Sequence, residues 1–223
     1  MDRAALANGG SGEMSMLVEM RVVELLNARL CHELVSPVGA INNGVELLGE
    51  EDADFVRDAI QLIGQSARKA SQRLQFYRFA YGTNASASAS GTPASGRDLS
   101  LGLFEETKIR CDWLAGAATL PSDWQRLACN MLVLAGEVLP RGGSVAVRPV
   151  RPGISGIEVV AEGESVNVSP EMRAALEPAA SVDELTSRTI QAYFAARLAA
   201  QLGAMLALVE AEPQRALFRA AIG

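Results

Sequence analysis

The sequence predicts an α+β protein in which a long helical hairpin precedes an α/β sandwich. Two observations predict this fold class. Apolar residues recur at steps of three and four through two long early segments, and short strand-like and helix-like patterns alternate later in the chain. Between them, "TNASASASGTPASGR" is small, polar and patternless. We therefore divide the chain into a flexible N-terminus (1–14), the hairpin (15–82), a linker or loop (83–97) and the sandwich (98–223).

Two apolar repeats predict the helices of the hairpin, one on each side of the polar turn "GEEDADF". The repeat positions are Leu30, Leu34, Val38, Ile41, Val45 and Leu48 in the first helix and Val56, Ile60, Ile63, Ala67, Ala70, Leu74, Tyr77 and Tyr81 in the second. Helices of roughly 30 residues joined by about five residues pack antiparallel.

A lone pair of helices leaves one side of its apolar stripe open, so a second element must cover it. We expect a homodimer in which two hairpins form a four-helix bundle. The alternative is that the second domain of the same chain covers the stripe.

The region after the linker predicts a mixed sheet with helices on one face. Strand patterns lie in "LSLGLF", "SVAVRPV", "GIEVVAEG", "AMLALVEA" and "RALFRAAI". Helix patterns lie in "DWQRLACNMLVLAGEVL" after Ser122, in "SPEMRAALE", and in "ELTSRTIQAYFAARLAAQLG", which Gly203 ends.

The composition narrows the class of partner. Of the 223 residues, 49% are apolar, which is ample for a core. The 20 basic and 26 acidic side chains give a net charge of -6 and a pI near 5.0. This acidic balance gives no basic footprint that would argue for nucleic acid or an anionic membrane as a partner. We expect proteins or small molecules as partners.

The cysteines and apolar segments predict a cytoplasmic protein. The chain has 3 cysteines and no CxxC pair, which fits neither a disulfide framework nor a zinc cluster. "MDRAALANGGSGEMSM" lacks the basic start and apolar run of a signal peptide. "AARLAAQLGAMLALV" is interrupted by Arg197 and Gln201 and is too short to span a bilayer.

The single histidine, His32, lies within the first predicted helix. It is about 200° around the helix from Leu34, so it points away from the apolar repeat. Steps of three and four place four further candidate partner-binding residues on its face, namely Arg29, Ser36, Gly39 and Asn43.

Pro37 follows His32 by five residues and lacks an amide hydrogen. We expect it to kink the helix and to free the carbonyl of Glu33. Gly39 and Gly44 are poor helix formers, and we expect them to leave a low surface beside the histidine.

A solitary exposed imidazole suits one kind of chemistry. It cannot assemble a metal site alone, and no serine or cysteine nucleophile motif accompanies it. An imidazole is uncharged and nucleophilic near neutral pH, so His32 could accept and donate a phosphoryl group. Glu33 could hydrogen-bond to the ring, orient it and stabilise the departing proton. The alternative is an exposed histidine that its neighbours merely solvate.

The sequence "HELVSP" resembles the phosphoacceptor box of two-component histidine kinases, which lies in a dimerising helical hairpin. More closely, "ARLCHELVSPVGAINNGVELL" and "SARKASQRLQFYRFAYG" resemble the ChpT-type histidine phosphotransferases of alphaproteobacteria, and the resemblance continues more weakly to the C-terminus. It implies that the second domain is a degenerate histidine-kinase ATPase-like sandwich that has lost nucleotide binding.

The residues that would bind ATP in a kinase are largely replaced here. "NMLVLA" keeps Asn130, but Leu134 stands where a second asparagine would bind magnesium, and an apolar side chain cannot ligate a hard cation. In "AEGES", Ala161 and Ser165 replace the aspartate and second glycine of the adenine loop. "SRTIQAYF" lacks the glycines of the phosphate loop. We expect no ATP hydrolysis, no bound cofactor and no metal site.

The resemblance implies a phosphorelay intermediate. His32 would take a phosphoryl group from the receiver domain of a hybrid histidine kinase and pass it to a response regulator such as CtrA or CpdR. Magnesium and a lysine would come from the receiver. An ATP-dependent histidine kinase and a non-catalytic scaffolding dimer remain as alternatives. Ser36 keeps a hydroxyl where such kinases position water, so phosphatase activity stays open.

A locally basic segment, "RKASQR" at 68–73, lies on the second predicted helix. We expect a solvated face. The alternatives are contact with an acidic receiver pocket or with acids of the first helix.

Overall fold

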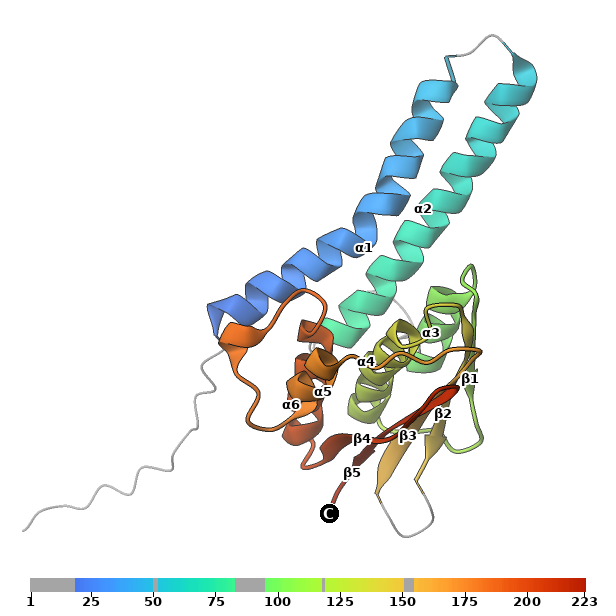
Figure 1. The fold of residues 1–223 in the computed structure, drawn as a ribbon. Helices are drawn as coiled ribbons and strands as arrows, with labels where there is room; N and C mark the ends of the chain where they lie inside the picture. Colours follow the sequence, from blue (N-terminus) through green and yellow to red (C-terminus); the bar gives the residue numbers. More distant parts are fainter. Residues whose placement is uncertain (1–18, 50–51, 83–94, 118, 151–154) are drawn as a thin grey trace, which may run out of the picture.

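The computed structural model of the chain describes residues 19–49, 52–82, 95–117, 119–150 and 155–223. The expected flexible N-terminus and most of the expected linker lie outside the described residues. A helical hairpin projects from a domain built on a five-stranded sheet (Figure 1). The α+β fold class with an N-terminal hairpin is therefore confirmed.

The hairpin consists of α1 (Met20–Leu47) and α2 (Ala53–Tyr81). The side chain of Asp52 caps α2 by accepting a hydrogen bond from the amide of Asp54 at 2.8 Å. Gly44 is buried between the helices, where a Cβ would come within 2.6 Å of Ile63 Cγ1. The expectation that Gly44 belongs to an open surface is therefore wrong, because its small size serves the close approach of α1 and α2.

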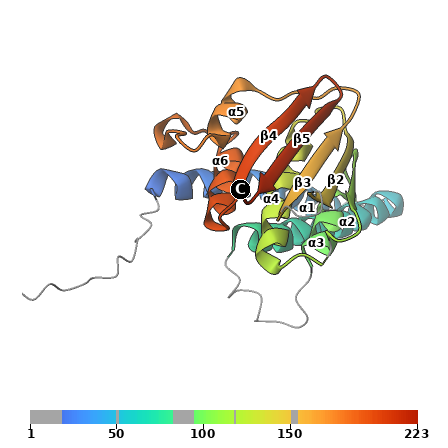
Figure 2. The same ribbon diagram turned by 90° about the horizontal axis from the view of Figure 1, so that it is seen from below.

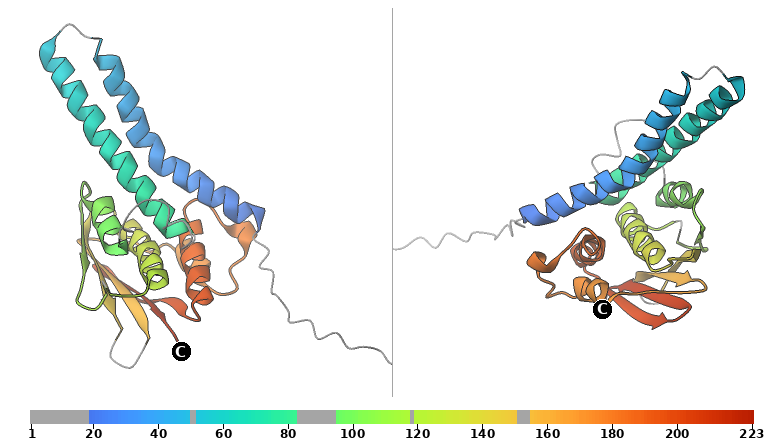
Figure 3. Two further views of the ribbon diagram at one scale, coloured as in Figure 1. Left: turned by 180° about the vertical axis from the view of Figure 1, so that it is seen from behind. Right: turned by 45° about the horizontal axis from the view of Figure 1, so that its top comes forward.

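Helix α1 bends along its length, and Pro37 lies inside it (Figure 1). Proline removes one backbone hydrogen bond and its ring crowds the preceding turn, so a bend is the expected response. The N-terminal half of α1 lies along the second domain, whereas the upper half of the hairpin stands clear of it (Figure 3).

The sheet has the strand order β1-β2-β3-β5-β4. Only the β1–β2 pair is parallel among its neighbouring strands. The strands are β1 (Ile109–Trp113), β2 (Gly143–Pro149), β3 (Gly156–Glu162), β4 (Met205–Glu212) and β5 (Arg215–Ala221). The last four match expected strands, which confirms the mixed sheet.

Helices cover one face of this sheet (Figure 2). They are α3 (Gly96–Phe104), α4 (Ser122–Glu137), α5 (Pro170–Leu176) and α6 (Ile190–Gln201), with a short 3-10 helix η2 (Val182–Glu184) between the last two. α6 begins later than expected, because the hydroxyl of Thr189 accepts a hydrogen bond from the amide of Thr186 at 2.9 Å and forms a turn before the helix.

The prediction of a strand in "LSLGLF" is wrong, because this segment belongs to α3. The hydroxyl of Ser95 caps α3 by accepting a hydrogen bond from the amide of Asp98 at 3.1 Å. The buried face of α3 consists of Gly96, Ser100 and Phe104 at helical spacing. Two of these residues are small, so the apolar pattern did not reveal the helix. The first strand is instead β1, whose sequence "IRCDW" alternates only weakly.

The main core lies between the sheet and its helices, and α4 is its centre. Every residue from 127 to 135 in α4 is buried. The hairpin differs, because Val38, Val45, Ile60 and Leu74 are 46%, 53%, 59% and 49% exposed. The second domain therefore covers the lower end of the apolar stripe, where Tyr77 is buried, and leaves these four residues uncovered. In the described part of the chain, no helix combines the length and hydropathy that crossing a membrane requires.

Candidate functional site

His32 is exposed on α1, five residues before Pro37. Ser36 and Asn43 are exposed on the same face, and a Cβ added to Gly39 would meet nothing within 4 Å. None of the described residues forms a hydrogen bond or an ion pair with the imidazole of His32. The ring is therefore open to a visiting molecule, and Gly39 leaves space beside it.

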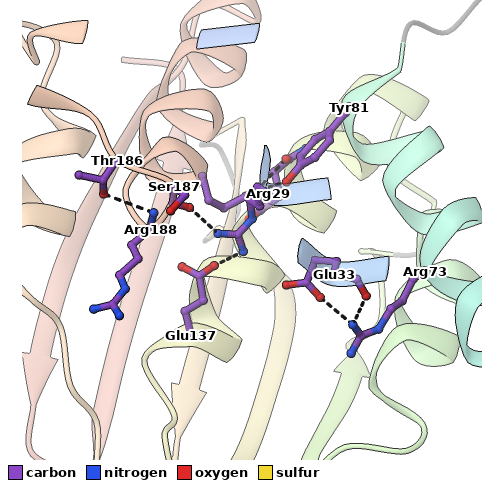
Figure 4. A network of polar contacts seen from close by, with 10 residues as sticks. Arg29, Glu33, Arg73, Tyr81, Glu137, Thr186, Ser187 and Arg188 are labelled. Atoms are coloured by element: carbon purple, nitrogen blue, oxygen red, sulfur yellow. Dashed lines mark hydrogen bonds and ion pairs between the residues drawn. The ribbon is translucent and has the colours of Figure 1, made fainter. Parts of the chain in front are cut away.

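Arg29 departs from this exposed face. It is only 9% exposed, and its guanidinium forms an ion pair with Glu137 at the end of α4 and donates to the carbonyl of Ser187 at 3.5 Å (Figure 4). The expectation that Arg29 lies open to a partner is wrong, because the second domain covers this end of α1. The helical angle alone does not reveal that cover.

The ion pair between buried Arg29 and the more accessible Glu137 joins the two domains. Burial on its own would lower the pKa of Arg29, but Glu137, Tyr81 and Tyr77 together outweigh it and raise that pKa. Burial raises the pKa of Glu137, and the guanidinium of Arg29 opposes this shift. Removing Glu137 would leave the guanidinium of Arg29 buried without its counter-charge.

Glu33 does not turn to the imidazole. Its carboxylate Oε2 accepts a hydrogen bond from Arg73 Nη1 of α2 at 3.0 Å, and its backbone carbonyl accepts one from the same nitrogen (Figure 4). The expected contact between Glu33 and the ring of His32 is not made. As Pro37 predicts, the carbonyl of Glu33 lacks its helical donor, and Arg73 donates to it instead. Arg73 of the basic segment 68–73 therefore pairs with an acid of the first helix, which was the alternative to a solvated face.

A second polar network ties the end of α2 to the sheet domain. The hydroxyl of Tyr81 donates to Gln191 Oε1 at 2.6 Å, and Gln191 Nε2 donates to Asn130 Oδ1 at 2.9 Å. Asn130 Nδ2 in turn donates to the carbonyl of Ala80 at 2.9 Å. Burial raises the pKa of Tyr81 to about 12, so its hydroxyl keeps its proton. Both amide groups are fully buried.

This network uses both polar ends of Asn130 within the chain. Leu134, one helical turn later, is fully buried in the core, and so is Ala161 on β3. Within the described ranges, no group of three or more histidine, cysteine, aspartate or glutamate side chains lies close enough to hold a metal ion. The side-chain amides of Asn130 and Gln191 are therefore used in hydrogen bonds inside the chain.

The residues that sequence reasoning missed all act across long distances in the chain. Glu137 and Arg29 are 108 positions apart, and Gln191 and Asn130 are 61 positions apart. Neither Glu137 nor Gln191 belongs to a motif. For Arg73 the sequence does suggest a partner, because the residue lies in the basic segment "RKASQR", for which acids of the first helix are one candidate.

Comparisons with known proteins agree with this architecture. Residues 97–214 match the family model described as the histidine phosphotransferase C-terminal domain. The chain is 34% identical over 204 residues to the protein phosphotransferase ChpT of Brucella abortus (strain 2308), which covers 87% of this chain and 94% of that protein.

A solved structure described as a bacterial phosphotransferase superimposes with a TM-score of 0.73 at 32% identity. The superposition covers 92% of this chain and 97% of that one, so the likeness extends over the hairpin and the sheet domain together. On this evidence, the chain belongs to the ChpT-type histidine phosphotransferases.

Proposed function

We propose that this protein is a cytoplasmic phosphorelay intermediate of two-component signalling, and that His32 carries the phosphoryl group. An imidazole nitrogen of His32 attacks the phosphorus of an aspartyl phosphate on a receiver domain. The N–P bond forms as the acyl P–O bond breaks, and the aspartate carboxylate leaves. A response regulator then takes the group by the reverse exchange at its own aspartate. The open imidazole of His32, on a member of this family, is the observation that carries the proposal.

The receiver would dock over the exposed face of α1. Ser36, Gly39 and Asn43 remain the docking candidates, because all three share the accessible face of His32. Arg29 is no longer a docking candidate, since it forms an ion pair with Glu137. The transfer needs positioning and charge neutralisation more than covalent help, and we assign the magnesium ion and a lysine to the receiver. A hybrid-kinase receiver is the proposed donor, and regulators resembling CtrA and CpdR are the proposed acceptors.

The proposal includes a homodimer through the upper hairpin. Ile60 and Val45 are more than half exposed, and Leu74 and Val38 nearly so. Apolar residues at steps of three and four along two helices are typical of a helical bundle that a second hairpin completes. The upper half of the hairpin stands clear of the sheet domain (Figure 3), which supports a partner from outside the chain.

The main alternative function is an ATP-dependent histidine kinase. The contacts of Asn130 favour the relay, because its amide is directed to Ala80 and Gln191 rather than left free for a metal ion. The apolar Leu134, buried in the core, offers no oxygen ligand for magnesium.

Transfer of label from a phosphorylated receiver tests the proposed function. Radiolabel should move from the receiver aspartate to the wild-type chain and should not move to His32→Ala. Asn27→Ala, an exposed change on the same helix, is the matched control and should accept label normally. Label on His32→Ala, or labelling of the wild type from ATP alone, would overturn the relay.

Sedimentation equilibrium tests the dimer. Ile60→Glu places a charge in the exposed apolar stripe and should give a monomer, whereas Gln61→Glu alters the neighbouring exposed position and should stay dimeric. A wild-type chain that sediments as a monomer at micromolar concentration would refute this part of the proposal.

A further inference from the structure

We propose that Arg73 of α2 is a positioning residue for phosphoryl transfer at His32. It would act by holding the backbone and the side chain of Glu33 one turn before Pro37, where α1 lacks a backbone hydrogen bond. This inference rests on the proposed function, in which His32 is the phosphoacceptor. It assigns to Glu33 a role other than contact with the imidazole.

Pro37 leaves one backbone acceptor of α1 without its usual donor. In an unbroken helix, the carbonyl of Glu33 would accept a hydrogen bond from the amide at position 37. Pro37 has no amide hydrogen, and it is buried inside α1. A shielded carbonyl without a partner costs about 1–3 kcal/mol. The turn that follows His32 therefore needs a donor from outside α1.

Arg73 supplies that donor. Its Nη1 bonds both to the carbonyl and, at 3.0 Å, to the carboxylate of Glu33. The two side chains are only 21% and 25% exposed, so water screens the contact less than it screens a surface ion pair. One nitrogen thus fixes residue 33 at two points and bridges α1 to α2.

The position of this bridge relates it to the phosphoacceptor. Glu33 directly follows His32, so the backbone that Arg73 holds also sets the direction in which the imidazole leaves the helix. No described residue holds the ring itself by a hydrogen bond or an ion pair. The direction of the ring therefore depends on the backbone of this turn.

In-line attack on phosphorus requires the nitrogen to lie close to the reacting atom and on its axis. A loosened turn would spread the ring over more orientations and lower the rate of transfer. Because Arg73 lies between the helices rather than on the exposed face, the affinity for the receiver should change little. This separation of rate from affinity distinguishes positioning from docking.

Single-turnover transfer from a phosphorylated receiver, measured over a range of receiver concentrations, tests the inference. The wild type must first label at His32, and a failure there contradicts the proposed function rather than the role of Arg73. Arg73→Ala should then lower the saturating rate constant by about tenfold or more, with a half-saturating concentration within about twofold of the wild type.

Two further variants separate positioning from a general loss of structure. Arg73→Lys should recover most of the rate, because one ammonium group can donate to both acceptors of Glu33. Arg57→Ala is the matched control, since it removes a 3.0 Å ion pair with Asp54 that lies within α2, and its rate should equal that of the wild type. If Arg73→Ala does not fold, Arg73→Gln supplies the same comparison.

A double-mutant cycle with Pro37→Ala tests the mechanism itself. This substitution would return an amide hydrogen to the carbonyl of Glu33, so Arg73→Ala should cost less in that background than in the wild type. Three results would each overturn the inference: an unchanged saturating rate for Arg73→Ala, a change confined to the half-saturating concentration, or equal costs in both backgrounds.

Discussion

The upper hairpin leaves several apolar side chains exposed, whereas the sheet domain buries its apolar side chains. In α4 of the sheet domain, every residue from 127 to 135 is buried. In the hairpin, Val45 and Ile60 are 53% and 59% exposed although they belong to a regular apolar repeat. The sheet domain therefore completes its own core, whereas the upper hairpin leaves apolar side chains exposed, and this is the surface that we propose a second hairpin covers.

Polar groups show the same contrast. Asn130 makes its hydrogen bonds within the chain, to Ala80, Arg126 and Gln191. His32 has no such bond to any described residue and stands on an exposed face. The group proposed for chemistry is thus one that the described packing leaves without a hydrogen bond or ion pair.

The largest expected effect tests the contrast between the two cores. Phe218 is fully buried in β5, so Phe218→Ala should lower the free energy of unfolding by about 3–5 kcal/mol. Ile60→Ala should change it by about 0.5 kcal/mol or less at concentrations where the chain is monomeric. Chemical denaturation measures both. A comparable loss from Ile60→Ala in the monomer would show that the stripe is covered within the chain.

An intermediate effect is expected where the two regions join. Asn130→Ala removes side-chain hydrogen bonds to Ala80 and Gln191, so it should cost about 1–3 kcal/mol of unfolding free energy. Asn42→Ala, at an exposed position of α1, is the control and should cost nothing measurable. Equal stability of the two variants, compared by urea denaturation, would mean that the buried network does not tie α2 to the sheet domain.

The smallest effect concerns the outer face of the sheet, where Glu158 bonds to Arg148 at 2.8 Å and to Arg219 at 2.7 Å. Burial alone would raise the pKa of Glu158, but the hydrogen bonds from Arg219 and Arg148 outweigh it and lower that pKa below its ordinary 4.5. The folded state then binds the proton less readily than the unfolded state. The carboxylate therefore stabilises the fold above the ordinary pKa, and this stabilisation disappears as pH falls through the folded-state value.

Glu158→Gln should consequently flatten the acid side of the stability profile. Because Arg148 and Arg219 are 38% and 40% exposed and can be solvated when the charge is removed, the loss near neutral pH should be about 1 kcal/mol. Thermal unfolding between about pH 3 and pH 7 measures it, because that range includes the ordinary carboxyl pKa. Glu164→Gln, at a position with no described ion pair, is the control. Parallel acid profiles for Glu158→Gln and the wild type would exclude this carboxylate as a source of acid sensitivity.

Local patterns predicted what depends on neighbouring residues. The repeat in α2 and the strands β2 to β5 follow from short-range periodicity, and the break at Pro37 follows from the missing amide hydrogen. The prediction failed at α3, because a face made of Gly96, Ser100 and Phe104 carries too few apolar residues to show a helical period.

The sequence by itself determined that His32 points away from an apolar helical stripe and that the carbonyl of Glu33 needs a donor. Only the tertiary structure decided that Arg73 is that donor, that Arg29 is buried against Glu137 and that Asn130 holds Gln191. The physical reason is range. Helical direction and backbone hydrogen bonding act within a few residues, whereas these pairings depend on how α1 and α2 pack on each other and on a domain folded from distant segments.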